Sequence, residues 1–470
     1  MTWEWRAPDE TVSTSKALLT AALAVLCFHA AYSFGPLLFP QLFIVGYAIG
    51  LVQLARLAST RKAFYLGLLT GFLCFAPQLV FFWEIFSAAA VVLWLILAFW
   101  IALFVALAQI ILARFGPRMA VLLLPFLWTG LEYTRSELYY LKFSWLNIGY
   151  ALAGWEQPVL PFLGMYGVGF LVVAIASGWL LARSKAAVVT IALLASFALL
   201  RFTASESKTS SAGPELRVAG VQLEFPAVNQ ILSALDILLA SHPDAQLVVL
   251  SEYTLDGPVP DSLKAWCRKT GCYLIVGGKD AALAGQYFNT AFVVSPAGKV
   301  VFSQAKSVPI PFFNDGFPAL RQSVWNSPWG KIGICICYDL SYRRVTDELI
   351  RQGAQMLVVP TMDVAEWGAQ EHASNARVAP VRAAEYGVPI FRLASSGISE
   401  AVNDHGKIIA RTTFPGPGEM LFAAFHLPSK ATLPHDRWFA PLCVLVTALL
   451  GLFLVLEPRI KRGRSRMTLR

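Results

Sequence analysis

The stretch GICICYDLSY, residues 333–342, carries the clearest signal of how this 470-residue chain folds. It overlaps the short apolar run KIGICICYD (331–339), which predicts a buried β-strand. Residues two positions apart share one face of a strand, so Cys335 and Cys337 would both face the core. A cysteine in such a run is usually a small hydrophobic residue, and we expect this of Cys335. We expect Cys337 to lie where the strand ends and the chain turns.

Two further charged residues also end apolar strands. Glu252 ends AQLVVLSE (245–252), and Lys306 ends FNTAFVVSPAGKVVFSQAK (288–306). Functional residues of α/β folds gather at such ends. A carboxylate can remove a thiol proton, and a lysine can lower the thiol pKa and stabilise an oxyanion, so the three residue types suit acyl transfer through a thioester. A lone Glu or Lys at a strand end is usually a surface residue, and spacing alone leaves that interpretation open.

Short β-rich runs alternate with amphipathic stretches between about residues 204 and 433, which predicts an α/β domain. The predicted strands are 216–224, 245–252, 272–280, a hairpin over 288–306, 331–339 and 355–361. The predicted helices are 229–243, 346–354 and 371–387.

The remainder of the chain is strongly apolar. Charged residues make up only 14% of the sequence, against about 25% in soluble domains. A helix needs about 20 apolar residues to cross a bilayer. Candidate spans are 16–33, 36–55, 63–83, 87–113, 119–136, 159–182, 186–202 and 438–457. The polar stretch 203–215 is interpreted as a linker.

Basic residues follow every second span. They are Arg56, Arg61 and Lys62, then Arg114 and Arg118, then Arg183 and Lys185, then Arg459, Lys461, Arg462, Arg464 and Arg466. The positive-inside rule places these connections and both termini in the cytoplasm, and the 204–433 domain outside it. The net charge of +9 is thereby explained by topology, and no nucleic-acid partner is expected.

The seven cysteines are too few and too scattered for a disulfide framework. Cys267 and Cys272 could pair if their domain lies outside the cytoplasm. No CxxC motif accompanies a histidine cluster, so we expect no metal and no cofactor. The N-terminus, MTWEWRAPDE, does not resemble a cleaved signal peptide.

The catalytic candidates are those of a known superfamily. GICICYDLSY, with Glu252 and Lys306 upstream, resembles the nitrilase superfamily, in which a Glu-Lys-Cys triad lies in an αββα sandwich. Further segments resemble the apolipoprotein N-acyltransferase family. They are LLPFLWTGLEYTRS (123–136), FSWLNIGYAL (143–152), GMYGVGFLVVAIASG (164–178), PVRAAEYGVPIFRLASSGIS (380–399) and NDHGKI (403–408).

This resemblance implies an α-helical polytopic membrane domain plus an α/β nitrilase-type domain. The expected parts are a membrane domain of about seven helices (1–202), the linker (203–215), an extracytoplasmic carbon-nitrogen hydrolase domain (216–430), a C-terminal transmembrane helix (438–457) and a basic tail (458–470).

The resemblance also implies a reaction in the bacterial cytoplasmic membrane. A phospholipid would donate an acyl chain to Cys337, and the α-amine of a lipoprotein's diacylglyceryl-cysteine would take it. A backbone N–H beyond the cysteine would complete the oxyanion hole. We expect a monomer. A membrane-anchored amidase or nitrilase remains an alternative, as does a divergent N-acyltransferase-like conjugation or assembly factor with an altered acceptor or no activity.

The segment after Lys306 departs from the family pattern. The family usually has Pro-Phe-Gly-Glu, whereas this chain has SVPIPFFNDGFP (307–318), with Asn314 where the Glu is expected and Asp315 beside it. Either residue could help to hold the intermediate. Tyr338 follows Cys337, and Asp339 stands where Glu is usual; both are candidates to support the site.

Several residues have weaker signals. The aromatic residues Trp83, Trp145, Trp155, Phe312 and Phe313 could dock acyl chains, but an interfacial aromatic belt is the favoured interpretation for most of them. For the charged residues, we expect Glu132 and Arg135 to pair or to approach a lipid headgroup, and Arg382 and Glu385 to brace their helix. His372 and His405 could touch the site, but solvated loops are the favoured interpretation for both.

Overall fold

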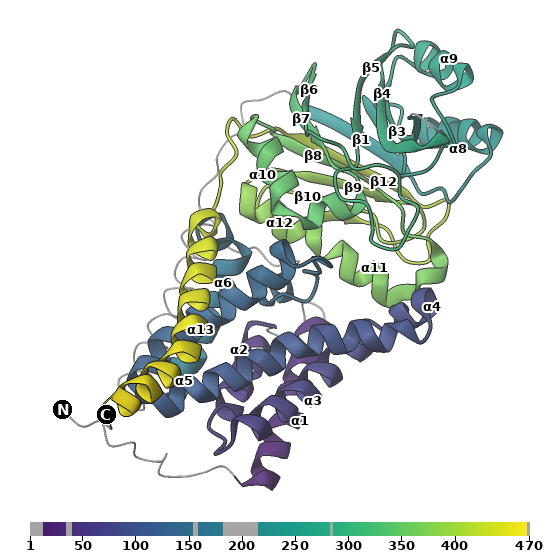
Figure 1. The fold of residues 1–470 in the computed structure, drawn as a ribbon. Helices are drawn as coiled ribbons and strands as arrows, with labels where there is room; N and C mark the ends of the chain where they lie inside the picture. The colour runs from purple at the N-terminus through teal and green to yellow at the C-terminus, as the bar shows by residue number, and fades with distance from the viewer. Residues whose placement is uncertain (1–12, 34–39, 154–157, 182–214, 283–284, 468–470) are drawn as a thin grey trace.

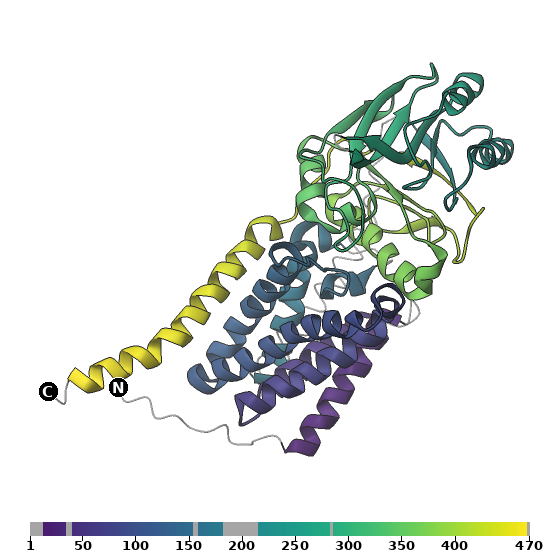
Figure 2. The same ribbon diagram turned by 45° about the vertical axis from the view of Figure 1, so that its right-hand side comes forward.

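The computed structural model describes residues 13–33, 40–153, 158–181, 215–282 and 285–467. Figures 1 and 2 show a bundle of helices at one end of the molecule and two packed sheets at the other. The helical part contains α1 (Thr14–Ser33), α2 (Pro40–Leu54), α3 (Thr60–Gln78), α4 (Phe81–Phe86), α5 (Ala89–Tyr133), α6 (Leu160–Leu181) and α13 (Asp436–Met467), with the short segments η1 (Thr134–Leu138) and η2 (Ile148–Leu152).

Four helices in the described part of the chain are long and apolar enough to cross a membrane: Thr14–Tyr32, Ala89–Leu138, Leu160–Leu181 and Asp436–Leu456. The predicted span 36–55 corresponds to the shorter apolar helix α2. The predicted span 63–83 is divided between α3 and α4 and is not among these four. The predicted span 186–202 lies outside the described residues.

The helix α5 contains a chain reversal. Gly116 has φ 73°, and the rings of Phe104 and Trp128, on either side of it, have centroids 5.0 Å apart. A straight helix would separate residues 24 positions apart by roughly 36 Å. The two arms therefore lie antiparallel, as the separate predicted spans 87–113 and 119–136 require.

The reversal lies beside the distal part of α13. Phe126 packs against Phe439 near the start of α13, whereas Phe115 packs against Phe453 further along it, each pair with ring centroids 5.9 Å apart. Figures 1 and 2 show α13 starting near the sheets and running away from them. The Gly116 turn is consequently at the end of the bundle remote from the sheets.

The second part is an αββα sandwich, as expected. Its first sheet has the order β12-β1-β2-β3-β4-β5 and its second the order β11-β10-β9-β8-β7-β6. The strands are β1 (Glu215–Val221), β2 (Leu247–Val249), β3 (Tyr273–Ala281), β4 (Tyr287–Val294), β5 (Val300–Ala305), β6 (Val324–Ser327), β7 (Gly330–Ile334), β8 (Met356–Thr361), β9 (Ile390–Ala394), β10 (Glu400–Val402), β11 (Ile408–Arg411) and β12 (Met420–His426).

Parallel pairing occupies the middle of each sheet. β1, β2 and β3 run parallel in the first sheet, and β7, β8 and β9 run parallel in the second. The sheets pack so closely that a Cβ on Gly220 would lie 2.6 Å from Leu393 Cδ1. This packing brings the ends of β2, β5 and β7, where the three catalytic candidates were predicted, toward one region.

Helices cover both outer faces of the sandwich (Figure 1). α8 (Val228–Ser241) and α9 (Asp261–Thr270) cover the first sheet; α10 (Arg343–Arg351), α11 (Gly368–Ala376) and α12 (Val378–Tyr386) lie on the side that meets the bundle. The predicted single helix 371–387 is in fact α11 and α12, which meet at Arg377. Pro380 explains the break, because its ring clashes with the carbonyl four residues earlier.

The two cysteines that could have paired do not. Cys267 and Cys272 are both free and both buried among the apolar residues beneath α9. The Cys272 thiol lies 3.3 Å from the carbonyl oxygen of Ala245 as a hydrogen-bond donor.

Candidate active site

Cys337 lies beyond the end of its strand, as predicted. β7 ends at Ile334, and Cys337 begins a short 3-10 segment (Cys337–Ser341) with φ 50°. A positive φ on a residue with a Cβ costs about 1–3 kcal/mol, and such strain is common at active sites. The thiol is buried and lies 3.8 Å from the carbonyl oxygen of Met362.

Glu252 and Lys306 form a buried ion pair. Lys306 Nζ is 2.8 Å from Glu252 Oε1 and 2.7 Å from Asp315 Oδ2. The other Glu252 oxygen accepts a hydrogen bond from the Met362 N–H at 2.8 Å. The carbonyl oxygen of Met362 contacts the Cys337 thiol. Met362, which follows β8, therefore links the carboxylate to the thiol region.

Burial and the neighbouring charges shift the pKa values of Lys306 and Glu252. Burial alone lowers the pKa of Lys306, but Asp315 and Glu252 outweigh it and raise this pKa well above its usual value. Burial raises the pKa of Glu252, partly offset by Lys306, and so makes it a stronger base than an exposed carboxylate.

The surroundings of Cys337 favour the neutral thiol over the thiolate. Burial, followed by the charge of Glu252, raises its pKa well above the usual value, and Lys306 only partly offsets this. The expectation that Lys306 lowers the thiol pKa therefore describes a real but minor effect. A thiolate can form here only if the proton moves to a nearby base.

Asp315, not Asn314, reaches the lysine. The Asp315 carboxylate is buried and also accepts hydrogen bonds from the Ile310 N–H and the Tyr253 hydroxyl, each at 2.8 Å. Burial would raise its pKa, but Lys306 outweighs this and lowers it. Asn314 is exposed, and its carbonyl oxygen accepts a hydrogen bond from Tyr287.

Asp339 ties the cysteine segment to the lysine segment. Its carboxylate accepts the N–H groups of Ser307 at 3.0 Å and Val308 at 2.7 Å, directly after Lys306. Tyr338 lies against the membrane part, with its ring centroid 5.8 Å from that of Trp145. Both residues thus hold neighbouring segments in place around Cys337.

Arg382 and Glu385 do more than brace α12. Their side chains pair at 2.6 Å, and Arg382 Nη2 also donates to the Ser341 carbonyl at 2.7 Å. Glu385 Oε1 accepts the Met165 N–H, at the kinked start of α6, at 2.6 Å. One fully buried pair therefore fastens the segment after Cys337 to the membrane part.

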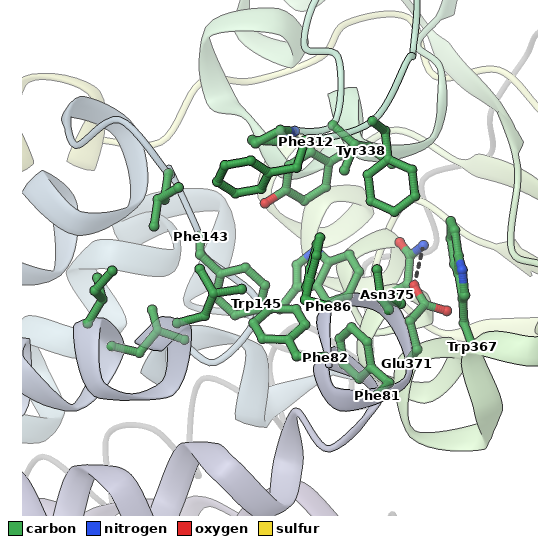
Figure 3. Close-up of a pocket in the computed structure, with 18 of the residues that line it drawn as sticks. Phe81, Phe82, Phe86, Phe143, Trp145, Phe312, Tyr338, Trp367, Glu371 and Asn375 are labelled. Atoms are coloured by element: carbon green, nitrogen blue, oxygen red, sulfur yellow. Dashed lines mark hydrogen bonds between the residues drawn. The ribbon is translucent and has the colours of Figure 1, made fainter. Parts of the chain in front are cut away.

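An apolar cavity lies between Cys337 and the bundle. It holds about 910 Å³ of unfilled space, including its open mouth. Figure 3 shows aromatic rings gathered around it. It is lined by α4 and α5, by the segment 139–145, by the segment 310–313, and by Cys337, Tyr338, Trp367, Glu371 and Asn375.

Three of the five aromatic candidates, Trp145, Phe312 and Phe313, line this cavity. Phe312 and Phe313 pack edge-on against Phe86 of α4, with centroids 5.9 and 6.0 Å apart. Trp145 lies on the facing segment and donates its indole N–H to Ser341 at 2.9 Å. Trp83 is half-exposed and is not a lining residue, and Trp155 lies outside the described residues.

Of the remaining charged candidates, some are buried and one is exposed. Glu132 and Arg135 are both buried inside the bundle; Glu132 accepts the Ile148 N–H, and Arg135, which also lines the cavity, donates to Asn147. His405 is exposed as expected. The expectation of a solvated loop for His372 is wrong, because it lies fully buried in α11.

His372 belongs to a cluster that the sequence did not reveal. Its Nδ1 lies 2.9 Å from Glu371 Oε2 and 3.7 Å from Asp363 Oδ2. Arg392 on β9 pairs with the same Asp363 oxygen. Asp363, Glu371 and His372 are residue types that can bind a metal ion, and they lie close together. Because the Arg392 guanidinium already neutralises Asp363, the group fits a balanced ion network better than a metal site.

Asn289 was also missed. Its amide donates to both Glu252 and Asp315, at 2.9 Å to the latter. In the sequence it is an ordinary polar residue at the start of a predicted strand. Only the pairing of β4 with β5 brings it beside Lys306, whose N–H donates to the Asn289 carbonyl at 2.8 Å.

Two family descriptions match successive parts of the chain. Residues 20–178 match the apolipoprotein N-acyltransferase N-terminal domain, and residues 212–428 match the carbon-nitrogen hydrolase family. The second range contains Glu252, Lys306 and Cys337, and the first contains the bundle residues that line the cavity.

Curated relatives span both parts. An apolipoprotein N-acyltransferase of Shewanella oneidensis is 25% identical over 508 aligned positions, which cover 93% of this chain and 96% of the relative. Another from Geobacter metallireducens is 25% identical and covers 75% of this chain and 79% of the relative.

Solved structures resemble the sandwich part. A carbon-nitrogen hydrolase from Helicobacter pylori has a TM-score of 0.39 and 18% identity and covers 45% of this chain and 89% of its own. An amidase from Nesterenkonia sp. has a TM-score of 0.39 and 21% identity, with coverage of 46% and 91%.

Proposed function

This chain belongs to the apolipoprotein N-acyltransferase family, and from that premise we propose that it moves a fatty acyl chain from a phospholipid to the N-terminal amine of a lipoprotein's diacylglyceryl-cysteine. It is a membrane acyltransferase with a nitrilase-type domain. One observation carries the detailed proposal: the buried Glu252–Lys306–Asp315 group and Cys337 meet beside an apolar cavity that the membrane part helps to line.

In the first half-reaction, Glu252 takes the Cys337 proton as the sulfur attacks an ester carbonyl of the phospholipid. Lys306 and a backbone N–H beyond Cys337 stabilise the oxyanion of the tetrahedral intermediate. The C–O bond then breaks, and the proton passes from Glu252 to the departing lysophospholipid oxygen. The product is a thioester on Cys337, with Glu252 ionised again.

In the second half-reaction, the uncharged α-amine attacks the thioester carbonyl. The C–N bond forms, the C–S bond breaks, and Glu252 passes a proton from nitrogen to sulfur. Water competes with the amine for the same thioester. The aromatic cavity supports transfer over hydrolysis, because a site that excludes water protects a reactive acyl intermediate.

The two alternatives have less support. A simple amidase would need neither an apolar cavity between its catalytic domain and a bundle nor more than one anchoring helix. A silent assembly factor would have no need of a buried lysine between two carboxylates, which is costly to desolvate. The replacement of the usual Glu, which favoured such a factor, is offset by the contact of Asp315 with Lys306.

The proposed orientation places the catalytic domain on the extracytoplasmic side and both termini in the cytoplasm. The turn at Gly116, flanked by Arg114 and Arg118, lies beside the distal half of α13, which leads to the basic tail. Two basic segments therefore share the end of the bundle remote from the sheets, which supports this topology. One chain supplies every proposed catalytic residue, which supports a monomer.

The test uses the full chain in vesicles whose phospholipid carries a labelled acyl chain. We expect intact-protein mass spectrometry to show one long-chain adduct on Cys337, which is lost when a diacylglyceryl-cysteine peptide is added. Cys337→Ala should abolish the adduct and the transfer, whereas the matched control Cys335→Ala should retain both. A fully active Cys337→Ala protein contradicts the mechanism, and a small adduct from a soluble amide in its place supports the amidase.

A further inference from the structure

Glu371 is the only carboxylate among the described residues that line the cavity. It is the fourth residue of α11 and is 2% exposed, and Figure 3 shows its side chain beside Asn375 and Trp367 at one end of the ring of aromatic residues. The mechanism above gives it no task. A buried carboxylate beside a reactive thioester site is costly to keep and is a candidate for function.

One oxygen of Glu371 lacks a hydrogen bond. Oε1 accepts a long bond from the Asn375 amide at 3.5 Å. Oε2 lies 2.9 Å from His372 Nδ1, the distance of an ion pair, and has no hydrogen-bond partner in the described part of the chain. A buried oxygen without a hydrogen bond is unfavourable, so a ligand donor placed there would be held strongly.

The groups around Glu371 leave it able to exchange a proton near neutral pH. The charged side chains that face it are His372 on its own helix, Asp363 after β8 and Arg392 on β9. Burial, then the charge of Asp363, raises the pKa of Glu371 to about 7. An α-amino group has a pKa of about 7.7–8.0, so proton transfer between the two is nearly balanced.

We propose that Glu371 binds a primary ammonium group in the cavity and takes its proton, so that the acceptor's amine reaches the Cys337 thioester uncharged. This inference rests on the proposed function and assigns the step that precedes attack. The ammonium N–H bond breaks and its proton joins the Glu371 carboxylate; the nitrogen keeps the electron pair that then forms the amide. Glu371 later releases the proton to solvent, while Glu252 handles the second proton.

A primary ammonium can come from two sources, the acceptor's α-amine or an ethanolamine headgroup of the donor. The two can be separated by half-reaction. Acyl-enzyme formation is followed with phosphatidylethanolamine vesicles and with phosphatidylglycerol vesicles, and transfer is then followed with a diacylglyceryl-cysteine peptide. Hydroxylamine, which is uncharged at neutral pH, serves as a nucleophile that needs no base to remove a proton beforehand.

For Glu371→Gln we expect acyl-enzyme formation at the wild-type rate from both vesicles, and transfer to the peptide slowed about 100-fold or more, the usual contribution of general-base catalysis. Release by hydroxylamine should stay unchanged. Glu371→Asp, which keeps the carboxylate, should recover part of the peptide transfer. Glu366→Gln, the same change at an exposed position outside the cavity, should behave as wild type.

Three results would overturn the proposal. Peptide transfer at the wild-type rate in Glu371→Gln would remove its role. A loss confined to acyl-enzyme formation from phosphatidylethanolamine would assign the site to the donor headgroup instead. An equal loss with the peptide and with hydroxylamine would mean that Glu371 only maintains the cavity's shape. If the wild-type chain forms no acyl-enzyme at all, the proposed function itself fails, and that outcome is visible before any Glu371 variant is compared.

Discussion

Cys337 lies between two regions that are built on opposite principles. On one side, the charges of Glu252, Lys306 and Asp315 are buried and each touches an opposite charge. On the other side, the cavity walls are formed by apolar side chains, many of them aromatic. Their rings pack edge-on against one another in contacts of similar geometry. A change in the first region leaves a buried charge without a partner, whereas a change in the second removes one contact among many. Large effects are expected from the first and graded effects from the second.

The largest effect in the charged region is expected from a substitution of Lys306. In Lys306→Met, two buried carboxylates face each other without a cation, and the oxyanion loses its nearest positive charge. We expect acyl-enzyme formation to fall about 1000-fold, the upper range for loss of one oxyanion donor. The rate is read from adduct appearance in labelled vesicles.

A matched lysine controls for this effect. Lys264 pairs with Asp261 at 3.0 Å, but that aspartate is almost fully exposed. Surface pairs contribute about 0–1 kcal/mol, so Lys264→Met should leave the rate unchanged. Equal rates for wild type and Lys306→Met would show that the charged region is not the source of catalysis.

Asp315 offers a smaller effect with a defined pH signature. Asp315→Asn keeps the size of the side chain but removes one of the two negative charges that contact Lys306. We expect acyl-enzyme formation to be roughly 10- to 100-fold slower. The Asp315 charge also raises the pKa of Glu252. Removing it lowers that pKa, so the acidic limb of the rate profile should move to lower pH while the maximum rate falls.

A substitution at the neighbouring Asn314 tests whether Asp315 alone replaces the family's usual Glu. Asn314 is exposed and contributes only its backbone carbonyl to Tyr287. Asn314→Ala should therefore stay within about twofold of wild type, as expected of a surface change. A larger loss for Asn314→Ala than for Asp315→Asn would reverse the assignment of the residue that replaces the family's usual Glu.

The charged region could largely be predicted from the sequence, since strand ends are visible as the last residue of an apolar run. Strand ends single out Glu252, Lys306 and Cys337 as candidates, the resemblance to the nitrilase superfamily favours a joint role for them, and the turn at Cys337 follows from the parity of Cys335 and Cys337. The choice between Asn314 and Asp315 could not be made, because it depends on how the loop after β5 folds back on the lysine.

The cavity side was much harder to predict. In the sequence, His372 is one histidine among polar residues at the start of the predicted helix 371–387, and nothing in that pattern indicates burial. It lies against Asp363, which follows β8, and Asp363 in turn pairs with Arg392 on β9, so its surroundings come from separate parts of the chain. Glu371 was missed for the same reason: its place on the cavity wall depends on where α11 ends before Pro380 and on how α4 lies against it.

Among the residues to which a role in the reaction is assigned, the smallest effect is expected at Phe312. Its ring is 70% exposed at the cavity and packs edge-on against Phe86 with centroids 5.9 Å apart. Such aromatic pairs contribute about 0.5–1.5 kcal/mol, so Phe312→Ala should lower kcat/KM for a long-chain phospholipid by roughly twofold to tenfold. A donor with short acyl chains should be affected less, because it leaves more of the cavity wall uncontacted. Phe317→Ala, an exposed phenylalanine that packs on Phe288 and does not line the cavity, is the control. An equal loss for short and long chains, or a loss as large as that of Lys306→Met, would mean that this wall acts on the chemistry itself and that the two regions are not separate in function.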